Sequence, residues 1–213
     1  MGLPRTVTPE ILDTLDAGHP DALRSRRDLR RLDGFLGGSR WISRVVRDHR
    51  READAGVIEL GAGDGRLCGL LAAGIEGVTG LDLGERPAGL NMRVHWRTGD
   101  FIHTLPGMKA GIVVGSLILH HFSDASLRVL GEMFQAFRVL IFSEPLRSRW
   151  ALGLSSLARP FVGRVTAHDM PASIRAGFQA GELASLLGLE PESWRVEESG
   201  TLAGVLRFKA WRR

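Results

Sequence analysis

The stretch that decides the fold is Val57-Ile58-Glu59-Leu60-Gly61-Ala62-Gly63-Asp64-Gly65-Arg66-Leu67. A short apolar run leads into three glycines at alternate positions, and a helix-like run, RLCGLLAAG (66–74), follows. Glycine takes left-handed backbone angles at little cost and lets a ligand come close to the main chain. The pattern therefore predicts a ligand-binding turn between the first strand of a parallel sheet and the helix after it.

The spacing of the glycines separates this turn from the common phosphate-binding loops. A dinucleotide loop reads G-x-G-x-x-G and a P-loop ends in G-K-[ST], whereas this one reads G-x-G-x-G. Asp64 lies inside the turn and Glu59 lies just before it. Two carboxylates repel a pyrophosphate but suit a ligand with an ammonium or sulfonium charge. The turn therefore disfavours NAD and ATP as ligands.

Apolar runs alternate with helical stretches along the rest of the chain. We expect strands within 77–83, 94–101, 111–119 and 138–145, a helix at 123–137, and an antiparallel hairpin within 194–211. Near-continuous valine, isoleucine and leucine in these runs predicts a parallel sheet that is covered on both faces.

Residues 1–51 are predicted to form an N-terminal helical cover. Thr8 is placed as an N-cap before Pro9, a second helix runs over 20–36 until Gly37 and Gly38, and Ser39 caps a third over 40–51. The segment holds 11 arginines and 7 acidic residues and so accounts for the whole net charge of +4. Because acidic residues interrupt the basic run, we interpret it as a solvated helix face rather than a nucleic-acid patch.

A long region at 145–172 interrupts the alternation of strands and helices with three prolines. It carries four arginines among apolar residues that include Trp150, Leu157 and Phe161. We interpret the region as a mobile cover over an acceptor site. The alternative is a helix packed on the sheet edge or a dimer contact. Residues 173–189 then read as helical, and Trp41 is expected either to close over the cofactor or to join the core.

Taken in order, the segments VIELGAGDGRL, GLDL, TGDF, GIVVGSLILHHFSD and RVLIFSEP resemble the class I S-adenosylmethionine-dependent methyltransferase family. The resemblance implies a Rossmann-like, doubly wound α/β fold with seven strands, the last antiparallel, plus the N-terminal helices. It places the methyltransferase domain at 52–213, with 145–172 as an acceptor-site insert. S-adenosylmethionine is the implied cofactor.

The resemblance also assigns cofactor contacts by position. An acid at the tip of the second strand can take both hydroxyls of a ribose, and the other roles follow from the family. Glu59 would lie near the methionine ammonium, the glycines along the methionine and ribose, and Ser116 on the methionine side. The implied cofactor-binding residues are Glu59, Gly61, Gly63, Gly65, Asp82, Leu83, Asp100, Phe101 and Ser116.

Transfer of a methyl group to a hydroxyl calls for alignment and one base. The candidates at strand ends and in the insert are His120, His121, His168 and Glu144. Each has a structural alternative: one histidine of LHHF packs under the next helix, Glu144 binds backbone amides, and His168-Asp169 caps a helix before Pro171.

The acceptor is inferred by elimination. The chain lacks the Asn/Asp-Pro-Pro-aromatic motif, the Pro-Cys nucleophile and the double-Glu loop of other enzymes with this fold. The LHHF turn resembles small bacterial methyltransferases that act on quinones, phenols or polyketides. We therefore expect O-methylation of such a small molecule in bacterial secondary metabolism. The alternatives are C-methylation of the same ring, an RNA methyltransferase docked through its arginine-rich N-terminus, and a binding protein without catalysis.

Composition narrows the setting. The single cysteine, Cys68, excludes an internal disulfide framework and is expected in the core, and the acids and histidines show no metal-ligand spacing, so we expect no metal. A signal peptide and a membrane-length apolar run are both missing from the 213 residues, which predicts a cytoplasmic protein. We expect a small-molecule acceptor as partner, no nucleic acid, no membrane, and a monomer or homodimer.

Overall fold

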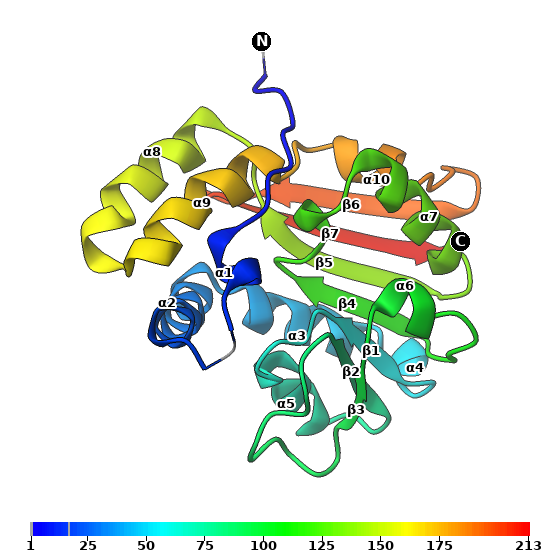
Figure 1. Cartoon of the computed structure of the whole chain (residues 1–213). Helices are drawn as coiled ribbons and strands as arrows, with labels where there is room; N and C mark the ends of the chain where they lie inside the picture. The colour runs from blue at the N-terminus through cyan, green and yellow to red at the C-terminus, as the bar shows by residue number, and fades with distance from the viewer. Residues whose placement is uncertain (1, 17) are drawn as a thin grey trace.

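The computed structural model describes residues 2–16 and 18–213, and it shows one seven-stranded sheet with helices on both faces (Figure 1). The strand order is β3-β2-β1-β4-β5-β7-β6. The strands are β1 (Val57–Leu60), β2 (Val78–Asp82), β3 (His95–Thr98), β4 (Ile112–Ser116), β5 (Val139–Pro145), β6 (Trp194–Gly200) and β7 (Val205–Arg212). The first five strands are parallel, and β7 is antiparallel to both β5 and β6. This confirms the expected doubly wound sheet and the C-terminal hairpin.

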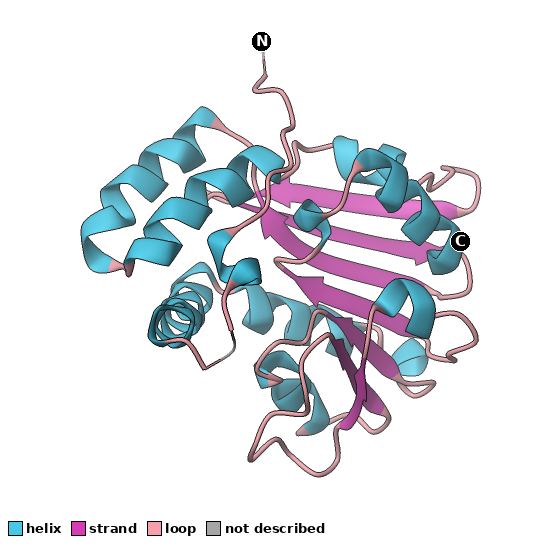
Figure 2. Ribbon diagram, viewed as in Figure 1, coloured by secondary structure: helices cyan, strands magenta, loops and turns pink. Residues whose placement is uncertain are grey.

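Helices cover the sheet on both faces (Figure 2). Alternate residues of the central strands enter two different hydrophobic cores. On β4, Val113 packs into one core, while Ile112 and Val114 pack into the other. The first core is closed by α6 (Phe101–Thr104), α7 (Asp124–Phe134) and α10 (Glu182–Leu186), and the second by α3 (Gly38–Asp48), α4 (Arg50–Ala53) and α5 (Arg66–Ala72). Burial on both faces explains why the strand sequences are continuously apolar. Cys68 is buried in the second core, as expected.

The reversal of strand order positions the site. Strand β1 pairs with β2 on one side and with β4 on the other, so the chain winds away from β1 in two directions. In open α/β sheets the crevice for ligands lies at such a point, outside the carboxyl ends of the strands. The glycine turn, Asp82 and the end of β4 all lie at this edge.

The N-terminal helices differ in part from expectation. Helix α2 (Pro20–Leu36) has the predicted bounds, and Gly37, with a φ of 73°, ends it. The next helix, α3, begins directly at Gly38, so the prediction that Ser39 caps it is wrong. The placement of Thr8 as an N-cap is also wrong, because the first helix, α1 (Ile11–Thr14), begins after Glu10. Tertiary contacts described below, and not the local sequence, fix that start.

The region after β5 folds into two helices joined by one turn. These are α8 (Arg149–Ala158), continued by the 3-10 turn η2 (Arg159–Phe161), and α9 (Arg164–Ala176). The buried carboxylate of Asp28 on α2 accepts a hydrogen bond from the amide of Gly163 at 2.6 Å, which joins α2 to the start of α9. The N-cap of α9 is Gly163, so His168-Asp169 lies within the helix and the prediction that it caps one is wrong. Because Val165 and Thr166 are buried, the helix begins at Arg164, well before Pro171, where the local sequence predicts its start.

The helix expected over 173–189 is also interrupted. Helix α9 ends at Gly177, where a side chain would collide with the carbonyl oxygen of Pro145, and Leu146 forms a bridge with Phe178. The chain then starts again as α10 after Gly181, whose φ is 85°. None of the helices in the described ranges combines the length and apolar character that crossing a bilayer requires.

Replacing Gly131 by alanine tests how closely α7 packs beside the turn after α10. A Cβ at Gly131 would lie 1.8 Å from the carbonyl oxygen of Leu187, so the two segments would have to separate. We expect the free energy of unfolding to fall by about 1–3 kcal/mol in urea denaturation. The matched control is Gly34→Ala in α2, where a Cβ meets nothing within 4 Å. Alanine there should raise stability by up to about 1 kcal/mol, and a similar loss at both positions would contradict the packing argument.

Candidate functional site

The glycine turn has the backbone that the sequence pattern predicts. Gly61, Gly63 and Gly65 all have positive φ, at 63°, 54° and 71°. Gly65 is also the N-cap of α5, so the turn leads directly into the helix. Side chains crowd two of these positions, because a Cβ at Gly61 would lie 2.5 Å from Ile118 and one at Gly65 would lie 2.7 Å from Leu90. The turn therefore needs glycine for both conformation and space.

Asp82 at the end of β2 binds the turn from the neighbouring strand. One carboxylate oxygen accepts a hydrogen bond from the amide of Gly63 at 2.7 Å, and the other accepts one from Gly84 at 2.8 Å. The next side chain, Leu83, is 77% exposed. An acid paired with an exposed apolar side chain at a ligand-binding edge suits a ribose and a flat ring.

Glu59 at the end of β1 is the buried acid of the turn. Burial raises the pKa of its carboxyl to about 8, and hydrogen bonding with Cys68 only partly opposes this shift. Its Oε2 is buried with no hydrogen-bond partner among the described residues. An unpartnered buried carboxylate oxygen is costly unless a ligand satisfies it, so Glu59 fits a cationic group placed beside the turn.

The other predicted cofactor residues lie at the ends of β3 and β4, which flank β2 and β1 in the sheet. Asp100 caps α6 by accepting a hydrogen bond from the amide of Ile102 at 2.9 Å, and it stays partly exposed. Phe101 is buried and packs against Phe122 with ring centroids 5.3 Å apart, so it belongs to the floor of this edge. Ser116 is half-buried at the end of β4, where the start of α3 comes close to it.

Glu144 at the end of β5 organises the turn after β4. Its Oε1 accepts hydrogen bonds from the amides of Ile118 and Leu119 at 3.0 and 2.9 Å. Its Oε2 accepts from the amide of His120 at 3.3 Å and from His120 Nδ1 at 2.8 Å. The residue before this turn, Leu117, has a φ of 57°, the one positive value outside glycine in the described chain. Glu144 is fully buried, and these bonds hold the turn after β4 in place.

His120 is held between two carboxylates. Its Nδ1 bonds Glu144, and its Nε2 lies 3.5 Å from Oε1 of Glu10. Burial lowers the pKa of this imidazole, but hydrogen bonds and charge from Glu10 and Glu144 outweigh burial and raise the pKa to about 9. With this pKa, His120 holds a proton at neutral pH, and a carboxylate faces each of its ring nitrogens. The pKa of Glu10 is lowered because hydrogen bonds from His120 and Ser173 outweigh its burial.

His121 is the more accessible histidine. Its Nδ1 lies 3.3 Å from Oδ2 of Asp13, and 27% of its side chain is exposed. The hydrogen bond with His121 is the main cause of a lowered pKa at Asp13. A carboxylate on one ring nitrogen fixes the tautomer and leaves the other nitrogen to face a substrate, which is the geometry of a histidine base.

His168 lies apart from this pair. It is exposed on α9, and its Nδ1 lies 3.0 Å from Oδ1 of Asp169. The same Asp169 carboxylate accepts hydrogen bonds from the amides of Ile11 and Leu12, each at 3.0 Å. Asp169 therefore holds the start of α1, which brings Glu10 and Asp13 to the two histidines.

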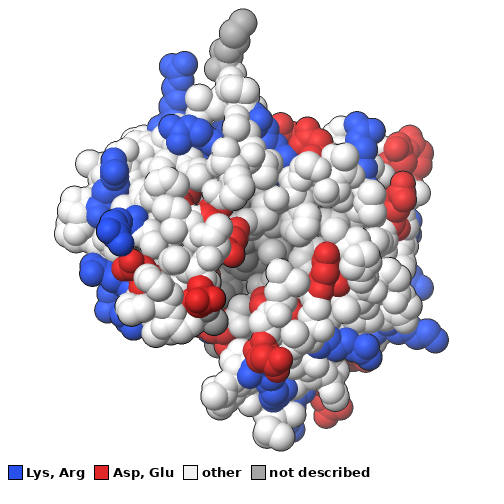
Figure 3. Space-filling model, viewed as in Figure 1, with Lys and Arg blue, Asp and Glu red and all other residues white. Residues whose placement is uncertain are grey.

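The sequence analysis missed Glu10 and Asp13, because both reach the site through tertiary contacts. Arg5 secures the segment that precedes them: it donates to the carbonyl oxygens of Phe122 at 2.8 Å and Ala176 at 2.8 Å. No local motif marks such an approach. Figure 3 shows this face hollowed in its middle, with acidic side chains along the rim.

One atom each of Glu10, His120 and His121 lies within 4.8 Å of the others, a spacing that suits a cation. The linear sequence gave no sign of this grouping, because Glu10 is remote in the chain. Carboxylates of Glu10, Glu144 and Asp13 already engage the two histidines. The arrangement as it stands is a proton-holding network.

The fold of the chain is shared with proteins of known structure. No protein-family model and no curated protein sequence matches the chain. Among solved structures, it is similar to magnesium protoporphyrin IX methyltransferase (ChlM) from Synechocystis PCC 6803 with bound SAH, at 19% identity over 84% of each chain and a TM-score of 0.59. It is also similar to the plantazolicin methyltransferase BamL in complex with a triazolic desmethylPZN analog and SAH, at 11% identity over 92% of each chain and a TM-score of 0.66. The pyocyanin biosynthetic protein PhzM matches at 21% identity over 96% of this chain and 62% of its own, with a TM-score of 0.64. The chain thus has the class I methyltransferase fold.

The raised pKa of His120 makes stability depend on pH. The value of about 9 in the folded protein exceeds the unperturbed 6.5, so folding binds this proton more tightly. The resulting stabilisation, up to about 3 kcal/mol, is fully present below pH 6.5 and is lost as the pH rises to 9. Glu10→Gln removes one of the two carboxylates. We expect it to lower the His120 pKa in an NMR titration and to flatten the loss of unfolding free energy across this interval.

The control for this titration is Glu52→Gln. Glu52 faces a different histidine, His49, at 3.7 Å on the surface. It should leave the pH profile of wild type unchanged. Identical profiles for wild type and Glu10→Gln would show that Glu10 does not hold the proton.

Proposed function

We propose that the protein is an S-adenosylmethionine-dependent methyltransferase that acts on a small molecule, most simply by O-methylation of a phenolic, quinone-like or polyketide acceptor in bacterial secondary metabolism. The observation that carries the proposal is the glycine turn fastened by Asp82 beside the unpartnered buried oxygen of Glu59. The fold, which is shared with methyltransferases whose structures contain SAM or SAH, supports it.

The cofactor half of the site is assigned to the edge formed by β1 and β2. Asp82 holds the ribose hydroxyls, and the exposed Leu83 packs on the adenine. Glu59 lies toward the methionine ammonium. The positive charge of that ammonium favours the ionised form of the Glu59 carboxyl. Asp100 lies toward the adenine edge and Ser116 toward the methionine. The cofactor supplies a methyl group on a positively charged sulfur, and its transfer leaves S-adenosylhomocysteine.

The acceptor half is assigned to the face where α1 covers the turn after β4. His121 takes the proton of the acceptor hydroxyl at Nε2, and Asp13 stabilises the imidazolium that results. His120 and Glu144 keep the turn in place and carry no proton to or from the acceptor. A hydroxyl attached to an aromatic ring is acidic enough for a single histidine to suffice. C-methylation of the same ring would use the same base.

The surface arginines argue against the RNA alternative. Arg30 of α2 pairs with Asp64 at 3.1 Å, and Arg66 pairs with Asp33 of α2 at 3.2 Å, so these two arginines are matched within the molecule. Phosphate binding needs basic side chains that are free to release counterions. Small-molecule methylation therefore remains the favoured proposal.

Calorimetry with S-adenosylmethionine and S-adenosylhomocysteine tests the cofactor half. Asp82→Ala removes the carboxylate that would accept hydrogen bonds from the ribose hydroxyls, and it removes the hydrogen bond to the Gly63 amide. We therefore expect cofactor binding to weaken by roughly tenfold or more, which is about 1.4 kcal/mol. Asp54→Ala, an exposed acid paired with Arg50 at 3.2 Å, is the matched control and should bind like wild type. If well-folded wild type binds neither ligand, the methyltransferase proposal fails and a non-catalytic role takes its place.

A panel of phenols, resorcinols and hydroxyquinones tests the acceptor half. Methylated products are detected by mass spectrometry with isotope-labelled cofactor. We expect His121→Gln to lower kcat by roughly 100-fold to 10,000-fold while cofactor binding stays the same, because the base is lost. His168→Gln, which changes an exposed side chain of α9, should change kcat little. Equal losses in both variants, or full activity in His121→Gln, would rule out His121 as the base.

A further inference from the structure

Helix α8 has an apolar face that nothing in the described chain covers. Ala151 and Ser155 point inward, and α9 lies between α8 and α1 (Figure 1). On the outer side, Trp150 is 60% exposed, Leu157 73% and Phe161 82%. With the half-buried Leu154, these positions follow one another by four, three and four residues, so they line one side of the helix and its 3-10 extension. We call these four residues the α8 stripe.

The stripe continues onto the neighbouring hairpin. The indole nitrogen of Trp150 donates a hydrogen bond to the carbonyl oxygen of Leu202 at 2.8 Å, and the Leu202 side chain is 89% exposed. Isolated exposed apolar residues are ordinary on protein surfaces, but a continuous row of large ones marks a surface of interaction.

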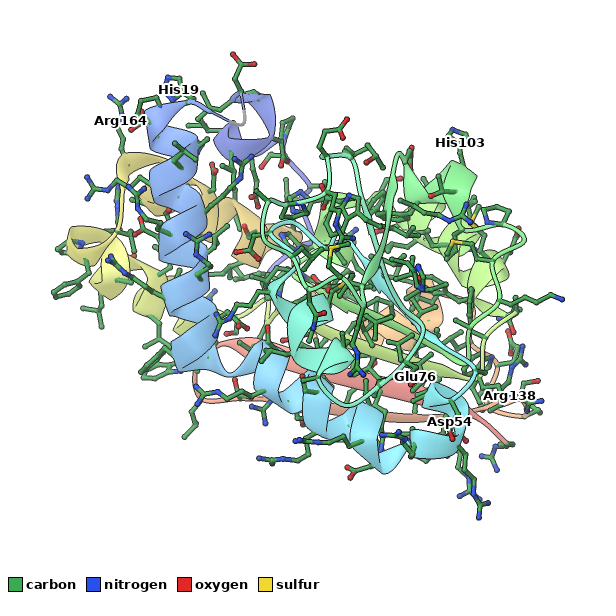
Figure 4. All side chains as sticks on the ribbon, turned by 90° about the horizontal axis from the view of Figure 1, so that it is seen from below. His19, Asp54, Glu76, His103, Arg138 and Arg164 are labelled. Atoms are coloured by element: carbon green, nitrogen blue, oxygen red, sulfur yellow. The ribbon has the colours of Figure 1, made fainter. Side chains whose placement is uncertain are left out.

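The segment that carries the stripe is basic. From residue 145 to residue 168 the chain has four arginines and no acidic residue. Arg149 and Arg159 are exposed at the two ends of α8, and no ion pair engages either one in the described chain. Arg164 is a third exposed guanidinium, beside the start of α2 and near His19 (Figure 4), where it pairs with Asp21 at 3.0 Å. Arg24 of α2 lies beside Gly163 in the same region.

We propose that the α8 stripe docks on the surface of an anionic lipid bilayer. A helix that lies in the membrane interface has this pattern: tryptophan, leucine and phenylalanine on one face with arginines beside them. The apolar side chains enter the boundary between headgroups and acyl chains, and the arginines meet lipid phosphates. The sequence led us to expect no membrane partner. The proposal departs from that expectation because the tertiary structure, and not the sequence, determines that the stripe is exposed. This inference does not depend on the proposed function.

Two other occupants fit the surface less well. A second copy packed on the same stripe about a two-fold axis would bring the arginines of both copies together with no acid to pair them. A protein partner would need a groove shaped to a convex row of protruding side chains, whereas a fluid lipid surface adapts to it.

Co-sedimentation of the full chain with vesicles tests the proposal. One set of vesicles is pure phosphatidylcholine, and the other contains equal parts of phosphatidylglycerol and phosphatidylcholine. We expect binding to the anionic vesicles that weakens with added salt, and little binding to the neutral ones. The double variant Leu157→Ser/Phe161→Ser should lower the partition coefficient at least tenfold. Arg149→Gln/Arg159→Gln should weaken binding to anionic vesicles and reduce its salt dependence.

The matched control is Met92→Ser, because Met92 is 89% exposed on the loop before β3 and lies outside the stripe. It should bind vesicles like wild type. All the altered side chains are exposed, so circular dichroism should show each variant folded. The proposal is overturned if wild type does not bind anionic vesicles, or if the stripe variant binds as well as wild type. Sedimentation showing a dimer that Leu157→Ser/Phe161→Ser converts to monomer, without vesicle binding, would assign the stripe to a second copy.

Discussion

The buried carboxylate of Glu144 is the interaction on which the acceptor side depends. It ends β5 and accepts hydrogen bonds from three successive amides of the turn after β4 and from the ring of His120. These hydrogen bonds to Glu144 offset the energetic cost of the positive φ of Leu117. It also fixes which way the next two side chains point, because His120 must face inward to reach Glu144 and His121 then faces outward. One carboxylate thus divides two adjacent histidines into a structural one and an accessible one.

The charges around Glu144 and His120 are balanced by a residue from a distant part of the chain, Glu10. A carboxylate as deeply buried as Glu144 needs a positive partner, and His120 provides it by holding a proton. The far side of that imidazolium is met by Glu10, which is delivered by the N-terminal segment. Asp169 holds the start of α1 and Arg5 holds the chain before it. The accessible pair of His121 and Asp13 exists only when these contacts have formed, so the acceptor side is assembled by the complete fold.

The sequence predicted the features that local residue patterns determine and missed those that tertiary contacts determine. The strands, the helix at 20–36 and the glycine turn were predicted because continuous apolar runs, helix-ending glycines and alternate glycines are signals that extend over only a few residues. Asp82 was placed because it ends a recognisable strand, and its bond to Gly63 agrees with that placement. Glu10 gave no signal, since its partner is more than a hundred residues away. The boundaries of α9 were missed for the same reason: burial against α2 overrode the proline signal at Pro171.

The α8 stripe and the proposed acceptor face meet in the pair of helices after β5. Helix α9 packs on α8 with one side and on α1 and α2 with another, so the same helix lies between the α8 stripe and the acceptor face. Its Asp169 sets the position of α1, and its Ser173 binds Glu10 beside His120. An apolar acceptor concentrates in lipid, because removing its surface from water is favourable. A protein that rests on a bilayer through α8 therefore holds its acceptor face one helix away from the place where such a compound is most abundant, and the region after β5 then serves as the structural link between membrane surface and site.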